Sequence, residues 1–175
     1  MTEQTAHADD RGPISSDLGR ALAIGAVLSS MALVVVDTGG TTASLPSIAA
    51  SLGIDPSLAV LTVSTYQAAV VMALLPSAAM GERFGLRRVF ALGLFTFTAA
   101  ALFAATANSL PWLLTARFVQ GLGASAILAL GMALLRSAVS DSALGSAVSW
   151  NAMTVALASA TGPALAALVL SHSSW

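Results

Sequence analysis

The amino-acid sequence predicts an all-α protein that crosses a membrane several times. Only 9% of its 175 residues are charged and 57% are hydrophobic, whereas a soluble domain carries roughly a quarter charged residues. Long uncharged runs fill most of the chain, and several of them reach the roughly 20 apolar residues that a helix needs to span the hydrocarbon core. Together these features argue against a water-soluble fold.

The remaining composition narrows the classes of function. The formal net charge is −1, so no excess of positive charge attracts nucleic acid. The sequence has no cysteine and shows no nucleophile–base pair, metal-ligand cluster or phosphate loop, so we expect no enzyme, metal or cofactor. All seven basic residues are arginine, which suggests GC-rich coding and a bacterial source.

The elements follow in order along the chain. Residues 1–18 are polar and acidic and contain Gly12-Pro13, which predicts a disordered cytoplasmic tail. Acidic residues outnumber arginines there, so the segment is not a signal peptide. We interpret residues 19–175 as one transmembrane bundle, separated into helices by segments that contain proline, glycine or charge. The predicted helices cover residues 20–44, 58–80, 89–107, 111–135 and 143–170.

The arginines outside these helices alternate between the two sides of the predicted bundle. They precede the first helix and lie in the loops after the second and fourth, whereas the loops after the first, third and fifth contain none. Because cytoplasmic loops carry the excess of basic residues, the N-terminus is predicted to be cytoplasmic. We expect a multi-pass protein of the plasma membrane, which in a bacterium is the inner membrane.

Two charged residues lie inside predicted helices. Asp37 lies about seven residues before the outer end of the first helix and Arg117 about seven after the outer start of the fourth, roughly 10 Å deep in both cases. Each costs about 2.5–3.5 kcal/mol at mid-membrane unless it is paired or hydrated. Opposite charge and matching depth predict one shared polar cavity. A structural ion pair that only fixes helix packing is the alternative.

Small and polar residues surround these positions. Gln120 lies on the same helix face as Arg117, and the run that follows, Gly121–Ala126, lets another helix approach closely. The fifth helix has a similar run ending in Gly162-Pro163, where the proline predicts a kink or hinge. Such runs are equally typical of plain packing faces.

Four segments resemble motifs of the major facilitator superfamily, and most closely those of its fourteen-helix drug:proton antiporters. The segment MGERFGLRRVF resembles the helix 2–3 loop of the family, with Leu86 in place of an expected arginine. The residues that fit this pattern are Glu82 (usually Asp), Arg83, Gly85, Arg87 and Arg88. A plain positive-inside anchor is the alternative interpretation of this loop.

The other three segments lie in the first, fourth and fifth predicted helices. LLTARFVQGLGASA resembles the helix 4 motif and keeps Arg117 and Gln120. ASATGPALAALV resembles the antiporter motif of helix 5 and keeps Gly162-Pro163, with alanines where glycines are usual. VVVDTGGTTASLPSIAASL resembles the helix 1 motif and keeps Asp37, with Thr42 where asparagine is common.

The resemblance implies a secondary transporter that exports amphipathic or cationic compounds by alternating access and draws its energy from the proton gradient. It implies proton coupling or substrate binding for Asp37, Arg117 and Gln120, a cytoplasmic gating role for the helix 2–3 loop, and bending at Gly162-Pro163. The alternatives are another metabolite or sugar carrier of the superfamily, or a non-transporting helical scaffold, which needs no charges at matched depth.

Superfamily transporters combine two six-helix halves, each a 3+3 inverted repeat. The five predicted helices correspond to the first three helices of one such half and to two of its second three (3+2). The sequence stops at SHSSW. We therefore expect an N-terminal fragment truncated before helix 6, whose partners are the missing C-terminal helices, the lipid bilayer and a small-molecule substrate.

The predicted topology can be tested with single cysteines, because the sequence contains none. A membrane-impermeant thiol reagent should label Arg87→Cys and Arg136→Cys only from the cytoplasmic side, and Asn108→Cys only from outside. Labelling of Asn108→Cys from the cytoplasm would contradict the five-helix arrangement.

Overall fold

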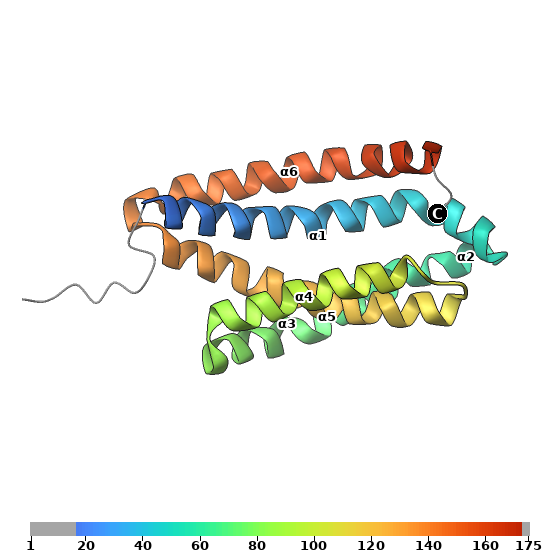
Figure 1. The fold of residues 1–175 in the computed structure, drawn as a ribbon, viewed down its shortest axis with the longest axis horizontal. Coiled ribbons are helices and arrows are strands. Elements are labelled where there is room, and N and C mark those ends of the chain that lie inside the picture. Colours follow the sequence, from blue (N-terminus) through green and yellow to red (C-terminus); the bar gives the residue numbers. More distant parts are fainter. Residues whose placement is uncertain (1–16, 173–175) are drawn as a thin grey trace, which may run out of the picture.

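The computed structural model describes residues 17–172, and helices account for nearly all of them (Figure 1). Five stretches are long and apolar enough to cross a membrane, so the predicted all-α fold with five spans is confirmed. The disorder predicted for residues 1–18 falls mostly on residues 1–16, which lie outside the described part. The helices are α1 (Asp17–Leu52), α2 (Pro56–Ala59), α3 (Leu61–Phe84), α4 (Leu86–Ala104), α5 (Leu110–Ala138) and α6 (Asp141–His172).

The first helix is longer than the sequence predicted. We expected it to end at residue 44, before Pro46, but α1 continues through this proline to Leu52. Ile48 and Ala49 in the extra turns are buried against residues of α2 and α5, so packing offsets the hydrogen bond that proline removes. Asp37 therefore lies about 15 residues, or ~22 Å, before the end of α1. The predicted end of the first helix was therefore wrong, although Asp37 and Arg117 do lie at the same level of the bundle, since their side chains are in contact.

The boundaries of the other four spans differ from the predicted ones by a few residues.

The second span starts with the short helix α2, whose N-cap Asp55 accepts a hydrogen bond of 2.8 Å from the backbone N–H of Ser57. Hydrogen bonds from the hydroxyl and the backbone of Ser57 lower the pKa of Asp55. This capped corner returns the chain into the bundle after the long α1.

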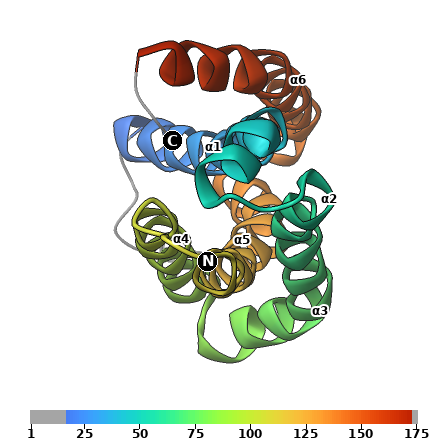
Figure 2. The ribbon, with the colours of Figure 1, turned by 90° about the vertical axis from the view of Figure 1, so that its right-hand side faces the viewer.

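Helix α5 is the centre of the bundle. It packs extensively against α3 and α4, while α1 packs mainly against α6 and joins the other three helices through α5. Figures 1 and 2 show α1 and α6 side by side, with α3, α4 and α5 grouped on the other side of α1. The bundle therefore consists of a pair, α1–α6, and a trio, α3–α4–α5.

Glycines on α5 allow the close packing of the trio. A Cβ atom on Gly123 would lie 2.5 Å from the backbone nitrogen of Phe97 in α4, and one on Gly121 would lie 2.5 Å from the backbone oxygen of Tyr66 in α3. A buried hydrogen bond of 2.8 Å between the hydroxyls of Ser77 and Ser125 also joins α3 to α5. Small residues thus bring these backbones together, as expected where no hydrophobic effect drives helix association.

We expect Gly123→Ala to lower the free energy of unfolding by about 1–3 kcal/mol, since the new methyl group overlaps the α4 backbone. The matched control is Gly25→Ala in α1, where no atom lies within 4 Å of the new Cβ, and which should be neutral or slightly stabilising. Thermal unfolding of the purified chain in detergent measures both. Equal stability of the two variants would contradict the close contact of α4 and α5.

Candidate functional site

The two charges inside the membrane spans meet in the structure. Nη1 of Arg117 on α5 donates a hydrogen bond of 2.9 Å to Oδ2 of Asp37 on α1. The side chain of Arg117 is 4% exposed and that of Asp37 22% exposed. Because both residues lie within apolar helices, this contact neutralises two charges that would otherwise be costly to insert.

Gln120 closes the pair into a triangle. Its Nε2 donates to Oδ1 of Asp37 at 2.9 Å, and its Oε1 accepts from Nη1 of Arg117 at 2.7 Å. The amide orientation follows from this network, because arginine can only donate and a carboxylate can only accept. We call Asp37, Arg117 and Gln120 the polar triangle. It links α1 to one face of α5, since Arg117 and Gln120 are three residues apart.

Two residues of α3 lie near the polar triangle, and neither was predicted from the sequence. The guanidinium carbon of Arg117 lies 4.8 Å from the ring centroid of Tyr66, a cation–π contact. Thr62 is fully buried and lines the same cavity as the polar triangle. Tyr66 is the single tyrosine of the sequence and could have been noticed as a polar group in an apolar span, whereas nothing distinguished Thr62.

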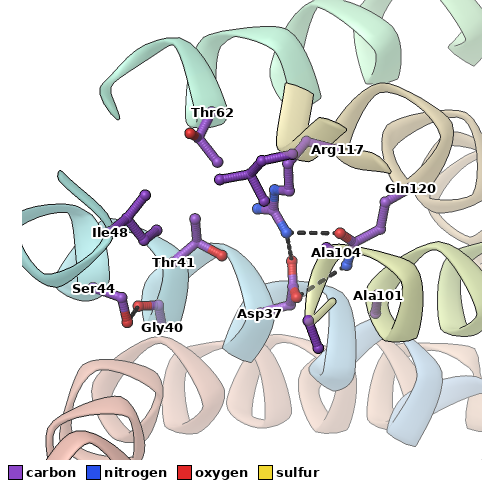
Figure 3. A pocket seen from close by; sticks show the side chains of 12 residues that line it. Asp37, Gly40, Thr41, Ser44, Ile48, Thr62, Ala101, Ala104, Arg117 and Gln120 are labelled. Atoms are coloured by element: carbon purple, nitrogen blue, oxygen red, sulfur yellow. Dashed lines mark hydrogen bonds and ion pairs between the residues drawn. The ribbon is translucent and has the colours of Figure 1, made fainter. Parts of the chain in front are cut away.

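The polar triangle borders a cavity of about 270 Å³. Figure 3 shows Asp37, Arg117 and Gln120 meeting at one end of this space, with Thr41, Ser44 and Ile48 following along α1. We call it the polar cavity. It is lined by Asp37, Gly40, Thr41, Ser44, Ile48, Thr62, Ala101, Ala104, Ala105, Leu113, Arg117 and Gln120.

A second cavity, of about 350 Å³, lies between α1, α3, α5 and α6. It contains no charged residue and only a few polar ones, so we call it the apolar cavity. Its lining residues are Val34, Val35, Thr38, Gly39, Tyr66, Gln67, Val70, Leu128 and Ser159. Its size and lining suit the apolar part of a small molecule.

The predicted hinge in α6 packs directly on α1 beside Asp37. A Cβ atom on Gly162 would lie 3.1 Å from the backbone oxygen of Val36, and one on Gly39 would lie 3.4 Å from the ring of Pro163. Pro163 lies inside the continuous helix α6. Thus the glycine-proline step contacts the segment of α1 that carries the carboxylate of the polar triangle.

The predicted helix 2–3 loop is almost entirely helical. Gly85, with φ of +97°, is the only residue between α3 and α4. Glu82 and Arg83 lie in the last turn of α3, and Arg87 and Arg88 lie in the first turn of α4, all exposed. Among the described residues no ion pair involves Glu82, and the guanidinium of Arg83 lies 5.3 Å from the ring centroid of Phe84. These charges are therefore available to a partner outside the described bundle.

Comparison with known proteins identifies the family. The sequence model of the Major Facilitator Superfamily matches residues 22–175. The chain belongs to the major facilitator superfamily. The resemblance of its motifs to this family is thereby confirmed, and membership implies a membrane protein whose relatives move small molecules across the bilayer.

Among superfamily members, the chain is similar to several bacterial transporters. It is 36% identical over 153 residues to the uncharacterized transporter YebQ of Escherichia coli, covering 87% of this chain and 34% of YebQ. It is 29% identical to MdtD of Klebsiella pneumoniae, a protein named for multidrug resistance, over 88% of this chain and 32% of MdtD. It is 28% identical to the riboflavin transporter RibZ of Clostridioides difficile, over 74% of this chain and 28% of RibZ. The chain thus spans about a third of the length of these relatives.

Removing one member of the ion pair should destabilise this superfamily bundle more than removing both. Arg117→Ala leaves the carboxylate of Asp37 buried without its partner, which we expect to cost about 3–5 kcal/mol of unfolding free energy. The double variant Asp37→Ala/Arg117→Ala should recover part of that loss. Thermal unfolding in detergent gives the coupling energy through a double-mutant cycle. Losses that simply add would show that the two side chains do not interact.

Proposed function

We propose that this chain is the N-terminal part of a proton-coupled secondary transporter that exports amphipathic or cationic compounds by alternating access. The observation that carries the proposal is the polar triangle, a carboxylate held by an arginine and a glutamine inside a membrane bundle. Membership of a transporter superfamily supports transport as such, and the triangle adds a group that can take up and release a proton.

The polar triangle connects the protonation of Asp37 to the packing of two helix groups. Burial favours a neutral carboxyl group and a nearby guanidinium favours an ionised one, so the proton and Arg117 compete for Asp37. When Asp37 takes up a proton, its ionic contact with α5 weakens, and α1 loses part of its attachment to the trio. Because α1 carries α6 with it through the contacts of Gly39 with Gly162 and Pro163, the pair can shift against the trio as one unit.

The substrate class follows from the apolar cavity and the carboxylate. Valines, a leucine and the ring of Tyr66 line much of the apolar cavity, which suits an aromatic or aliphatic body. Thr38, the neighbour of Asp37 on α1, lines this cavity, and a cationic group there could replace Arg117 as the ionic partner of Asp37. The relative MdtD, named for multidrug resistance, supports the same class.

The exposed charges around Gly85 belong to the same proposal. Glu82, Arg83, Arg87 and Arg88 lie at the ends of α3 and α4 without ion-pair partners within the described bundle. A second helical half could bind them on the cytoplasmic side and so hold one conformation closed. The glycine at positive φ keeps these charges on a one-residue corner, where they move together with both helices.

A metabolite carrier of the same superfamily is the second candidate. It is favoured by the similarity to RibZ, whose name assigns riboflavin as its substrate. The two candidates differ in the ligand that drives proton exchange: a lipophilic cation for the drug exporter and a neutral or anionic metabolite for the carrier.

The test is proton release from the purified complete transporter when tetraphenylphosphonium, a lipophilic cation, is added. We expect release by the wild type and none by Asp37→Asn, because the amide cannot bind the exchanged proton. Arg117→Ala should also lose proton release, and Arg117→Lys should restore it only in part. Lysine offers a point charge without the planar fork of arginine.

Asp55→Asn is the matched control, because Asp55 is an exposed N-cap outside the spans, and it should release protons like the wild type. Unchanged release in Asp37→Asn would assign the coupling to another carboxylate. Release on adding riboflavin and none on adding the cation would favour the metabolite carrier.

A further inference from the structure

Arg117 has more hydrogen-bond donors than the described protein satisfies. Its side chain carries five N–H donors, and both side-chain hydrogen bonds of Arg117 within the described residues leave from Nη1. Nε and Nη2 are buried and have no partner among the described residues. A buried donor without a partner is destabilising, so this part of the bundle keeps polar groups that the described chain does not pair.

Thr62 is a second buried group without a partner. Most serines and threonines in these helices donate to a carbonyl oxygen three or four residues earlier, as Thr38 and Thr98 do. The hydroxyl of Thr62, on a fully buried residue, has no partner in the described chain. The carbonyl four residues earlier, that of Leu58, already accepts a hydrogen bond from the N–H of Val60 at the end of α2.

The residues that carry these groups, Arg117 and Thr62, are among those that line the polar cavity, which has room for several water molecules. A buried water needs about 10–15 Å³ of such volume and two to four polar partners, and the cavity measures about 270 Å³. Arg117 and Asp37 already neutralise each other, so a neutral ligand fits better than an ion. Water in this cavity can reach the carboxylate of Asp37, whose side chain is 22% exposed.

The polar cavity extends from the triangle toward the end of the bundle that holds the α1–α2 corner. Along α1 its lining residues are Asp37, Gly40, Thr41, Ser44 and Ile48, one face of a helix that runs toward that corner. In α5 it reaches back to Leu113, near the start of the helix, and in α4 it reaches Ala104 near the end. The arginine alternation predicts that this end of the bundle faces outside.

The polar and apolar cavities share no lining residue. Tyr66 lies between them, because its ring contacts the guanidinium of Arg117 in the polar cavity and also lines the apolar one. The charged or titratable groups around Asp37 are Arg117 from α5 and Tyr66 from α3. The nearby described segments of α4 and α6 contribute alanine, glycine, proline and Ser159, none of which carries a charge.

We propose that the polar cavity is a hydrated access site through which protons from the outer side reach Asp37 without passing through the apolar cavity. This inference rests on the proposed function. A hydrated proton transfers to a carboxylate oxygen of Asp37, forming an O–H bond and leaving a neutral water, while Arg117 keeps its charge. The reverse transfer returns the proton to water. Substrate and proton then use separate spaces on the two sides of Tyr66.

The first experiment tests hydration and uses this chain, which has no cysteine. Thr41→Cys should react from the outer side with a membrane-impermeant methanethiosulfonate, because a hydrated thiolate attacks the reagent's sulfur and displaces methanesulfinate. Ala69→Cys is the control, since Ala69 is fully buried near Gly121 and should not react. Adding Ala101→Leu, which places a larger side chain in the polar cavity, should block the labelling of Thr41→Cys. Absence of labelling at Thr41→Cys would overturn the proposed access site.

The second experiment tests the proton route in the complete transporter. Ala101→Leu should slow proton release on adding tetraphenylphosphonium by about tenfold, equal to a barrier higher by about 1.4 kcal/mol, with unchanged equilibrium binding of the cation. The matched control is Ala99→Leu, on an exposed part of α4 away from this cavity, which should release at the wild-type rate. Thr62→Val keeps the side-chain shape, loses the hydroxyl, and should also slow release.

The outcomes separate the two proposals. A wild-type rate in both Ala101→Leu and Thr62→Val overturns the access site and leaves the proton-coupled transporter intact. Weaker cation binding in these variants also overturns it, because the polar cavity would then hold substrate. No proton release by the wild type overturns the proposed function, and with it the proton route.

Discussion

The structure depends on neutralising one buried charge. Arg117 lies almost completely buried in the central helix α5, where an arginine is costly in a bilayer. Its Nη1 donates a hydrogen bond to the carboxylate of Asp37, 80 residues away in the sequence. This contact fixes the rotation of α1 against α5. Gln120 forms one hydrogen bond with each partner and limits the geometry of the pair further. A displaced α1 would leave both charges unpaired in hydrocarbon, so one contact sets the arrangement of two helices.

Close helix packing makes this contact possible. Gly121 and Gly123 bring α3 and α4 against α5, which places Tyr66 and Thr62 around the guanidinium. Gly162 brings α6 against α1 next to Val36, one residue from the carboxylate. Small residues therefore serve two purposes: they join helices that have no hydrophobic reason to associate in lipid, and they connect the polar triangle to the segments that can move.

The same packing separates two kinds of space within one small bundle. Polar groups converge on the side of α1 that faces α3, α4 and α5, and apolar side chains line the space that also reaches α6. Tyr66 lines the apolar space and turns its π face toward Arg117, which lines the polar one. A transporter that exchanges a proton for an amphipathic molecule needs these two environments close together but distinct. Two superfamily relatives of this chain carry different names, one for riboflavin transport and one for multidrug resistance.

The sequence by itself determined the number of spans, the membrane class and the family, because hydrophobic length, charge content and short motifs are local properties of the chain. It also indicated Asp37, Arg117 and Gln120, since a charge inside an apolar run is visible without coordinates. It could not determine the true length of α1, because burial of Ile48 and Ala49 against distant residues carries the helix past Pro46. It could not find Thr62, whose importance arises only from a missing partner and a shared cavity. Those features depend on contacts between helices far apart in the sequence, and only the tertiary structure decides them.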